Sequence, residues 1–165
     1  MKKIVTILIS TLMIFTLVGC SSSKVDRDPV LSEDLTKVLE RIYETADLDK
    51  EFKSSLEYYQ TVELNEENIQ GYLGNTDVTF TEGICSAPMM SSIPYELILL
   101  KLDEKADVDE VKSSIKENAN PRKWVCVEAE EVIVESIDNT VLFLMANKTE
   151  ADPIKDAFMS LAEAK

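Results

Sequence analysis

Tyr95-Glu-Leu-Ile-Leu-Leu-Lys-Leu102 is the stretch of sequence that decides the fold. Apart from Glu96 and Lys101 it is apolar, and Pro94 and Asp103 bound it on either side. A short apolar run between residues that interrupt regular structure is typical of a buried strand. The sequence therefore predicts the central strand of a sheet here.

Further strands are predicted before and after this one. Val78 and Phe80 alternate with threonines, which is the period-two pattern of a half-buried strand. Two more segments, 131–136 and 140–146, are rich in β-branched and apolar residues and flank residues 137–139, whose Asp-Asn pair indicates a hairpin turn. With helices between these strands, we predict an α+β fold: an antiparallel four-stranded sheet with helices packed on one face, preceded by an N-terminal signal helix.

Apolar residues at helical spacing predict the helices. The clearest amphipathic pattern consists of Leu35, Val38, Leu39, Ile42, Tyr43 and Ala46. The residues predicted to cap the four helices are Ser32, Asn65, Asp107 and Asp152. Gly74 is expected to end the second helix, and Pro153 to occupy the first position of the last. Two segments, 48–60 and 122–129, fit more than one structure: the first a helix or a loose surface segment, the second a strand or the end of a helix.

The first twenty residues resemble the export signal of a bacterial lipoprotein. Lys2 and Lys3 precede an uncharged, mostly apolar run that ends in Leu17-Val-Gly-Cys20. A basic start, an apolar run of this length and a small residue before the cut are typical of a secretory signal peptide. The run is shorter than the roughly 20 residues that a membrane-spanning helix needs. The sequence therefore predicts cleavage before Cys20, although an ordinary signal peptide or an uncleaved anchor helix would also begin in this way.

Cys20 is the predicted lipidation site, because Leu-x-Gly-Cys resembles a lipobox. The division that follows is residues 1–19 as lipoprotein signal peptide, 20–29 as flexible tether, and 30–165 as a single α+β domain. Two or three acyl chains, at about 0.8 kcal/mol per buried CH₂, anchor a protein far more firmly than one chain does. We therefore expect the protein at the outer face of the cell membrane, with the membrane as a partner through this anchor.

Composition excludes several classes of function. The formal net charge is −14, and it becomes −16 once Lys2 and Lys3 leave with the signal peptide. Phosphate backbones repel such an acidic domain, so nucleic acid is not an expected partner. The chain contains no histidine, which excludes Ser-His-Asp and Cys-His catalysis and imidazole-based zinc sites. With few glycines there is also no phosphate cradle, and no cofactor is predicted.

Two cysteines remain besides the lipidated one, Cys85 and Cys126. In an extracytoplasmic domain they could form a disulfide. The alternative is two buried free thiols, which the apolar surroundings of Cys126 favour.

Clustered carboxylates are the remaining chemical candidates. Asp103, Asp107 and Asp109 surround a strand-to-helix turn, where capping explains them better than a metal. The acidic stretch 47–51 lacks the glycine and glutamate of a calcium loop. Glu128, Glu130 and Glu131 could pair as acid and base, although a solvated surface explains them better.

Ala87-Pro-Met-Met-Ser-Ser92 is unusual because neither helical nor strand periodicity explains its adjacent methionines. One interpretation is that the loop folds under the sheet, with methionine filling a gap. The other is a flexible apolar contact surface for a partner. Pro88, Met89 and Met90, with Glu96 of the following strand, form the candidate partner surface.

The order of these features resembles DUF4358, a family of small lipoproteins of Gram-positive bacteria, chiefly clostridial types. The shared pattern is a lipobox, a tether, an N-terminal helix, the Pro-Met-Met turn, an apolar strand opening with Glu96, a Val-x-x-Val helix and a terminal hairpin with a helix. It spans about residues 30–163, and Ala87-Pro-Met-Met90 is its most specific part. The chain departs from the family at Pro121, where members often continue the helix. The resemblance implies placement at the cell envelope and no catalytic residues.

Two classes of function follow from the sequence. The first is a non-enzymatic, membrane-anchored binding or interaction module, whose partner is an envelope protein or a small molecule. The alternative is an enzyme that acts on envelope polymers through paired carboxylates.

Overall fold

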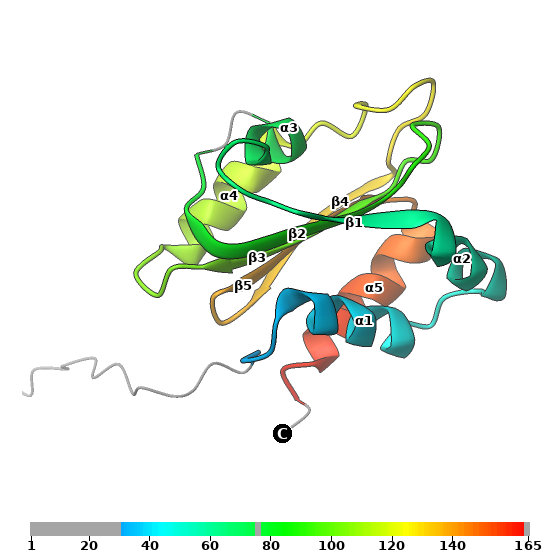
Figure 1. The fold of residues 1–165 in the computed structure, drawn as a ribbon. Coiled ribbons are helices and arrows are strands. Elements are labelled where there is room, and N and C mark those ends of the chain that lie inside the picture. The colour runs from blue at the N-terminus through cyan, green and yellow to red at the C-terminus, as the bar shows by residue number, and fades with distance from the viewer. Residues whose placement is uncertain (1–30, 75–76, 164–165) are drawn as a thin grey trace, which may run out of the picture.

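A computed structural model describes residues 31–74 and 77–163, so the predicted signal peptide, the tether and Cys20 lie outside the described residues. The fold is α+β, as predicted (Figure 1). Its elements in chain order are α1 (Leu35–Thr45), α2 (Lys50–Ser55), the 3₁₀ turn η1 (Leu56–Tyr58), β1 (Tyr59–Glu63), α3 (Ile69–Leu73), β2 (Phe80–Pro88), β3 (Glu96–Leu102), α4 (Val108–Asn118), β4 (Glu131–Ile137), β5 (Thr140–Ala146) and α5 (Lys148–Ser160).

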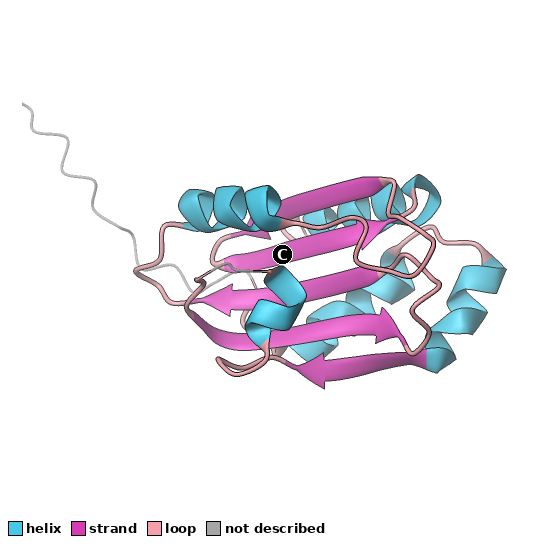
Figure 2. Cartoon of the chain, turned by 90° about the horizontal axis from the view of Figure 1, so that it is seen from above, coloured by secondary structure: helices cyan, strands magenta, loops and turns pink. Residues whose placement is uncertain are grey.

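The sheet has five antiparallel strands in the order β1-β2-β3-β5-β4, and the predicted count of four was wrong (Figure 2). The missed strand is β1, which lies at an edge and exposes Gln60, Thr61 and Glu63. An edge strand with few buried side chains leaves no apolar alternation to detect. β3 is central, as predicted, and pairs with β2 and β5.

Helices cover both faces of the sheet, which corrects the prediction of one covered face. In Figure 1, α3 and α4 lie above the sheet, whereas α1, α2 and α5 lie below it. The central strand supplies the reason, because Leu97, Ile98, Leu99 and Leu100 are all completely buried. Successive side chains of a strand point to opposite faces, so an unbroken apolar run must be covered on both sides.

Two hydrophobic cores therefore flank the sheet. Leu97 and Leu99 belong to the core between the sheet and helices α1 and α5. Ile98 and Leu100 belong to the other core, to which α3 and α4 contribute Ile69, Leu73 and Ile115. Cys85 also lies in this second core.

The ends of the helices agree with the sequence in part. Asp107 caps α4 through its side chain, and Gly74, with φ of 79°, ends α3, both as predicted. Asp34 rather than Ser32 caps α1. Asn68 precedes α3 and Asn147 precedes α5, where Asn65 and Asp152 were expected. α5 begins at Lys148, so Pro153 lies inside the helix and not at its first position as predicted, and the helix lacks one backbone donor there.

The two open segments take different structures. Residues 48–60 contain α2, the 3₁₀ turn and the start of β1. Residues 119–130 form neither helix nor strand and make a long loop between α4 and β4.

Burial on both faces predicts that Leu99→Ala and Leu100→Ala each lower the free energy of unfolding by about 3 kcal/mol, because each change leaves a cavity in a different core. The measurement is urea denaturation of wild type and the three variants, in which the control, Val125→Ala at an exposed position, is expected within about 0.5 kcal/mol of wild type. A decrease in the free energy of unfolding of less than about 1 kcal/mol for either leucine variant would contradict the burial of that side chain in a packed core.

Candidate functional site

The two ends of the sheet differ in what they carry. The first described residues join the end where β2 begins and β3 finishes, because the Leu35 amide donates to Glu82 Oε1 at 2.8 Å. Lys101 Nζ donates to the Glu33 carbonyl at 3.4 Å at this same end. The loop 89–95, which joins β2 to β3, lies at the opposite end. The seven residues of β3 separate these ends by roughly 20 Å.

We call the end with loop 89–95 the distal end. Loop 119–130 reaches the same place, and the Val125 amide donates to the Ser91 carbonyl at 3.0 Å (Figure 1). This bond joins two loops that are about 30 residues apart in the sequence. The distal end is therefore built from both loops.

An apolar patch marks these loops. Met89, Met90 and Val125 expose 63%, 61% and 62% of their surface, and we call them the Met–Val patch. The interpretation that the methionines fill a gap beneath the sheet was wrong. Pro88 ends β2 and is half-buried beside the patch. Exposed apolar side chains gathered at one place are typical of a contact surface.

A buried ion pair lies beside the patch. Glu96 is only 4% exposed, and Lys123 Nζ donates to both of its carboxylate oxygens at 2.9 and 2.8 Å. Lys123 also donates to the Tyr72 carbonyl at 3.3 Å. Burial raises the pKa of the Glu96 carboxyl above its usual value, and the Lys123 ammonium offsets part of that rise. Glu96 thus fixes loop 119–130 to the sheet from inside and is not part of the exposed surface.

Removal of the ammonium is expected to leave an unpaired buried carboxylate. Lys123→Met should lower the free energy of unfolding by about 3 kcal/mol near neutral pH. It should also raise the pKa of Glu96 further, as measured by NMR titration of the side-chain carboxyl. The carboxyl then holds its proton more tightly in the folded than in the unfolded chain, so the variant regains stability as the pH falls from neutral toward the unfolded pKa.

Lys105→Met, at an exposed lysine, is the matched control and should change neither quantity. An unchanged Glu96 pKa in Lys123→Met would show that the two groups are not paired.

The other side of the distal end holds a small pocket, which we call the aromatic pocket. It has a volume of about 140 Å³ and is lined by Phe52, Ser55, Tyr59, Ile93, Pro94, Tyr95, Asn147 and Glu150. The rings of Phe52, Tyr59 and Tyr95 contact one another, with centroids 5.1 to 5.8 Å apart. Behind them, the Tyr43 phenol lies 2.9 Å from both the Ser86 hydroxyl and the Tyr95 phenol. This bonding holds the buried Tyr95 in place.

Burial raises the pKa of Tyr43 to about 12 and also raises that of Tyr95. Both phenols are therefore neutral at physiological pH, where they serve as hydrogen-bonding groups and as apolar surface.

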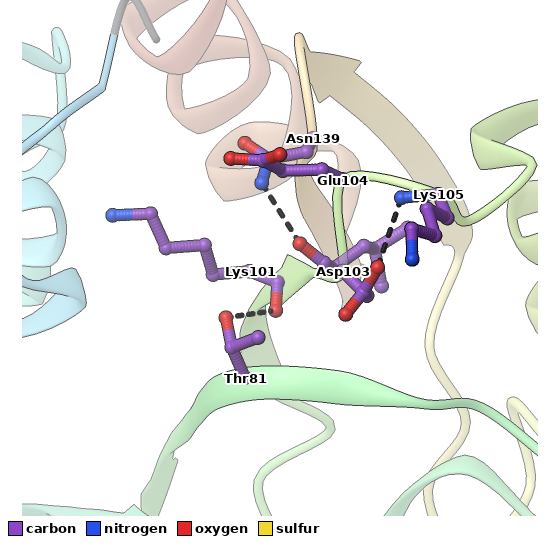
Figure 3. Close-up of a pocket in the computed structure, with 7 residues that line it drawn as sticks. Thr81, Lys101, Asp103, Glu104, Lys105 and Asn139 are labelled. Carbon is purple, nitrogen blue, oxygen red and sulfur yellow. Dashed lines mark hydrogen bonds between the residues drawn. The ribbon is translucent and has the colours of Figure 1, made fainter.

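A larger hollow of about 480 Å³ lies at the opposite end of the sheet (Figure 3). Its polar side chains close turns: the Thr81 hydroxyl donates to the Lys101 carbonyl and the Asn139 amide to the Leu102 carbonyl. Asp103 accepts from the Lys105 amide. In Figure 3 the Lys101 side chain extends away from Asp103 and Lys105. The Thr81, Asp103 and Asn139 side chains are thus bonded to the backbone of this end of the sheet, which favours a structural role here.

Cys85 and Cys126 lie in different environments. Cys85 is a buried free thiol, and desolvation raises its pKa strongly. Cys126 is an exposed free thiol in loop 119–130, with φ of 63°. Cys85 and Cys126 therefore do not form the disulfide that the sequence allowed. Of the two alternatives, burial as a free thiol holds for Cys85 alone.

Glu128, Glu130 and Glu131, which the sequence singled out as a group, are engaged with basic residues and not with one another. Glu128 pairs with Arg122, Glu130 accepts from the Lys148 amide, and Glu131 lies 3.5 Å from Lys148 Nζ. Within residues 31–74 and 77–163, no group of three or more acidic or cysteine side chains is placed to hold a metal ion. In the same ranges, no helix combines the length and apolarity needed to cross a membrane.

The sequence pointed to the Met–Val patch only through its methionines. Val125 and Lys123 were missed because they lie in a loop without periodicity. Phe52, Tyr59 and Tyr95 were missed as a group because their proximity depends on how α2, β1 and β3 meet. The only indication in the sequence was that all three residues are aromatic.

No protein-family model, curated protein or solved structure matches this chain. The resemblance to DUF4358 therefore stays a prediction, and the candidate site rests on geometry.

Proposed function

We propose that the protein is a membrane-anchored extracytoplasmic lipoprotein that acts as a non-enzymatic binding module through its distal end. The lipobox ending in Cys20 supports the anchor, and the resemblance to DUF4358 supports placement at the envelope. The observation that carries the binding role is the exposure of the Met–Val patch at the end opposite to the first described residues.

The position of the two ends matters for an anchored protein. A chain held by lipid at Cys20 enters the domain near Leu31, beside the hollow and the start of α1. The Met–Val patch then lies roughly 20 Å farther along the sheet. Anionic headgroups repel the acidic domain, which favours an orientation that stands off the bilayer. The distal end is thereby presented to an envelope protein.

Methionine suits such a contact. Its unbranched, polarizable side chain adapts to different apolar partners with little strain. Ordering two exposed methionines costs side-chain entropy, which the burial of their apolar surface must exceed. The bond between Val125 and Ser91 reduces this cost because it already fixes the backbone of both loops.

Loss of the lipidation site tests the anchor. Cys20→Ala removes the acceptor of the diacylglyceryl group, so the protein should leave the detergent-soluble membrane fraction or accumulate with its signal peptide uncleaved. Fractionation with mass spectrometry of the N-terminus measures both. Cys126→Ala, which removes an exposed thiol, is the control and should leave membrane attachment unchanged. A cleaved, membrane-bound Cys20→Ala protein would contradict the proposal.

Site-specific photocrosslinking tests the distal end. A photoreactive residue at position 90 should give a discrete adduct with an envelope protein in intact cells, whereas the same residue at exposed position 105, at the other end, should not. Met89→Glu placed beside the crosslinker should reduce the adduct at least about fivefold, because a charge must then be desolvated on contact. Equal adducts from both positions, or an adduct insensitive to Met89→Glu, would argue against a specific surface.

A further inference from the structure

We propose that the aromatic pocket binds a small organic cation, an alkylated ammonium group. This inference rests on the proposed function, because it names a ligand class for a binding module. The pocket adjoins loop 89–95 through Ile93 and Pro94, so it belongs to the same distal end as the Met–Val patch.

The walls of the pocket suit a cation that carries alkyl groups. Phe52, Tyr59 and Tyr95 are mutually inclined by 54° to 73°, so they form a continuous aromatic wall with differently oriented rings. A cation within about 6 Å of a ring centroid is attracted by the negative face of the ring. Alkyl groups on the nitrogen gain in addition from contact with the rings and with Ile93 and Pro94.

The charge at the pocket also favours a cation. Glu150 lines it, and its carboxylate adds to the rise in the pKa of Tyr59 that burial mainly causes. The start of α5 at Asn147 acts in the opposite sense, because a helix N-terminus carries roughly half a positive charge. A full carboxylate charge outweighs that half charge at similar distance. The net charge of −14 adds a field that draws cations toward the domain.

Asn147 supplies a polar group for orientation. It precedes α5, yet its side chain does not cap the helix and makes no hydrogen bond with any of the described residues. The side chain lines the pocket beside Glu150. An amide oxygen that the fold does not use is available to a hydroxyl or ammonium hydrogen of the ligand.

Size restricts the ligand. A volume of about 140 Å³ admits a compact head group and not a whole larger solute. A trimethylammonium group is a head group of this compact kind. A larger solute would place only its cationic head in the pocket, with the remainder in solvent.

Calorimetric titration with choline and with 3,3-dimethyl-1-butanol, its neutral isostere, tests the inference on the full-length lipidated protein in dodecyl maltoside at fixed ionic strength. Choline should bind saturably in the millimolar range, and the alcohol at least about tenfold more weakly, since only the charge differs. n-Butylammonium, which mimics a lysine side chain, should bind more weakly than choline. Tighter binding of the butyl compound or equal binding of the alcohol would overturn the assignment.

Two variants locate the binding. Glu150→Gln should weaken choline at least about tenfold, whereas Glu117→Gln, the same charge change at an exposed position of α4 on the other face, should alter it less than about twofold. Phe52→Leu keeps an apolar wall without the ring, so it should weaken choline and leave the alcohol unchanged. Near-ultraviolet circular dichroism confirms that each variant is folded.

The outcomes separate the two proposals. If choline fails to bind while the position-90 crosslink persists, the pocket assignment is wrong and the binding module stands. If both fail, the proposed function is wrong as well.

Discussion

The burial of β3 on both faces is the constraint on which the rest of the structure depends. Four consecutive side chains, from Leu97 to Leu100, are inaccessible to water and point alternately into two cores. Neither core could be left open, because each would expose apolar surface worth several kcal/mol. The helices on both sides, and hence the places where their connecting loops meet, follow from this requirement. The distal end is one of those meeting places.

Polar side chains in this fold hold helix ends and loops against the sheet, whereas apolar side chains pack the helices onto it. Glu82 holds the start of α1, and the pair of Glu96 and Lys123 holds the long loop that crosses from α4 to β4. A buried ion pair adds little net stability because the desolvation of both charges offsets their attraction. It does select one arrangement of the loop, since a displaced Lys123 would leave the Glu96 carboxylate buried and unpaired. Specific positioning of the loop is its structural effect.

Periodicity in the sequence predicted the strands β3, β4 and β5, because side chains of these strands alternate or run continuously in a way that burial explains. It failed at β1, whose side chains are mostly exposed, and for loop 119–130, whose position depends on single contacts such as that of Val125 with Ser91. The sequence of β3 also contained the information that both faces are covered, since an amphipathic strand would alternate. The aromatic pocket could not be predicted, because its rings come from three elements whose relative placement no local pattern specifies.

Loop 89–95 belongs to two surfaces at once. Its first residues, Met89 and Met90, face solvent, and its last residues, Ile93 and Pro94, form part of the aromatic pocket. A contact that favours one conformation of these seven residues changes the free energy of any contact made on the opposite side. Thermodynamic linkage makes that effect reciprocal, so a solute in the pocket and a macromolecule at the methionines would each alter the affinity of the other by the same factor. Any coupling between the two proposed sites would therefore pass through this one short connection between β2 and β3.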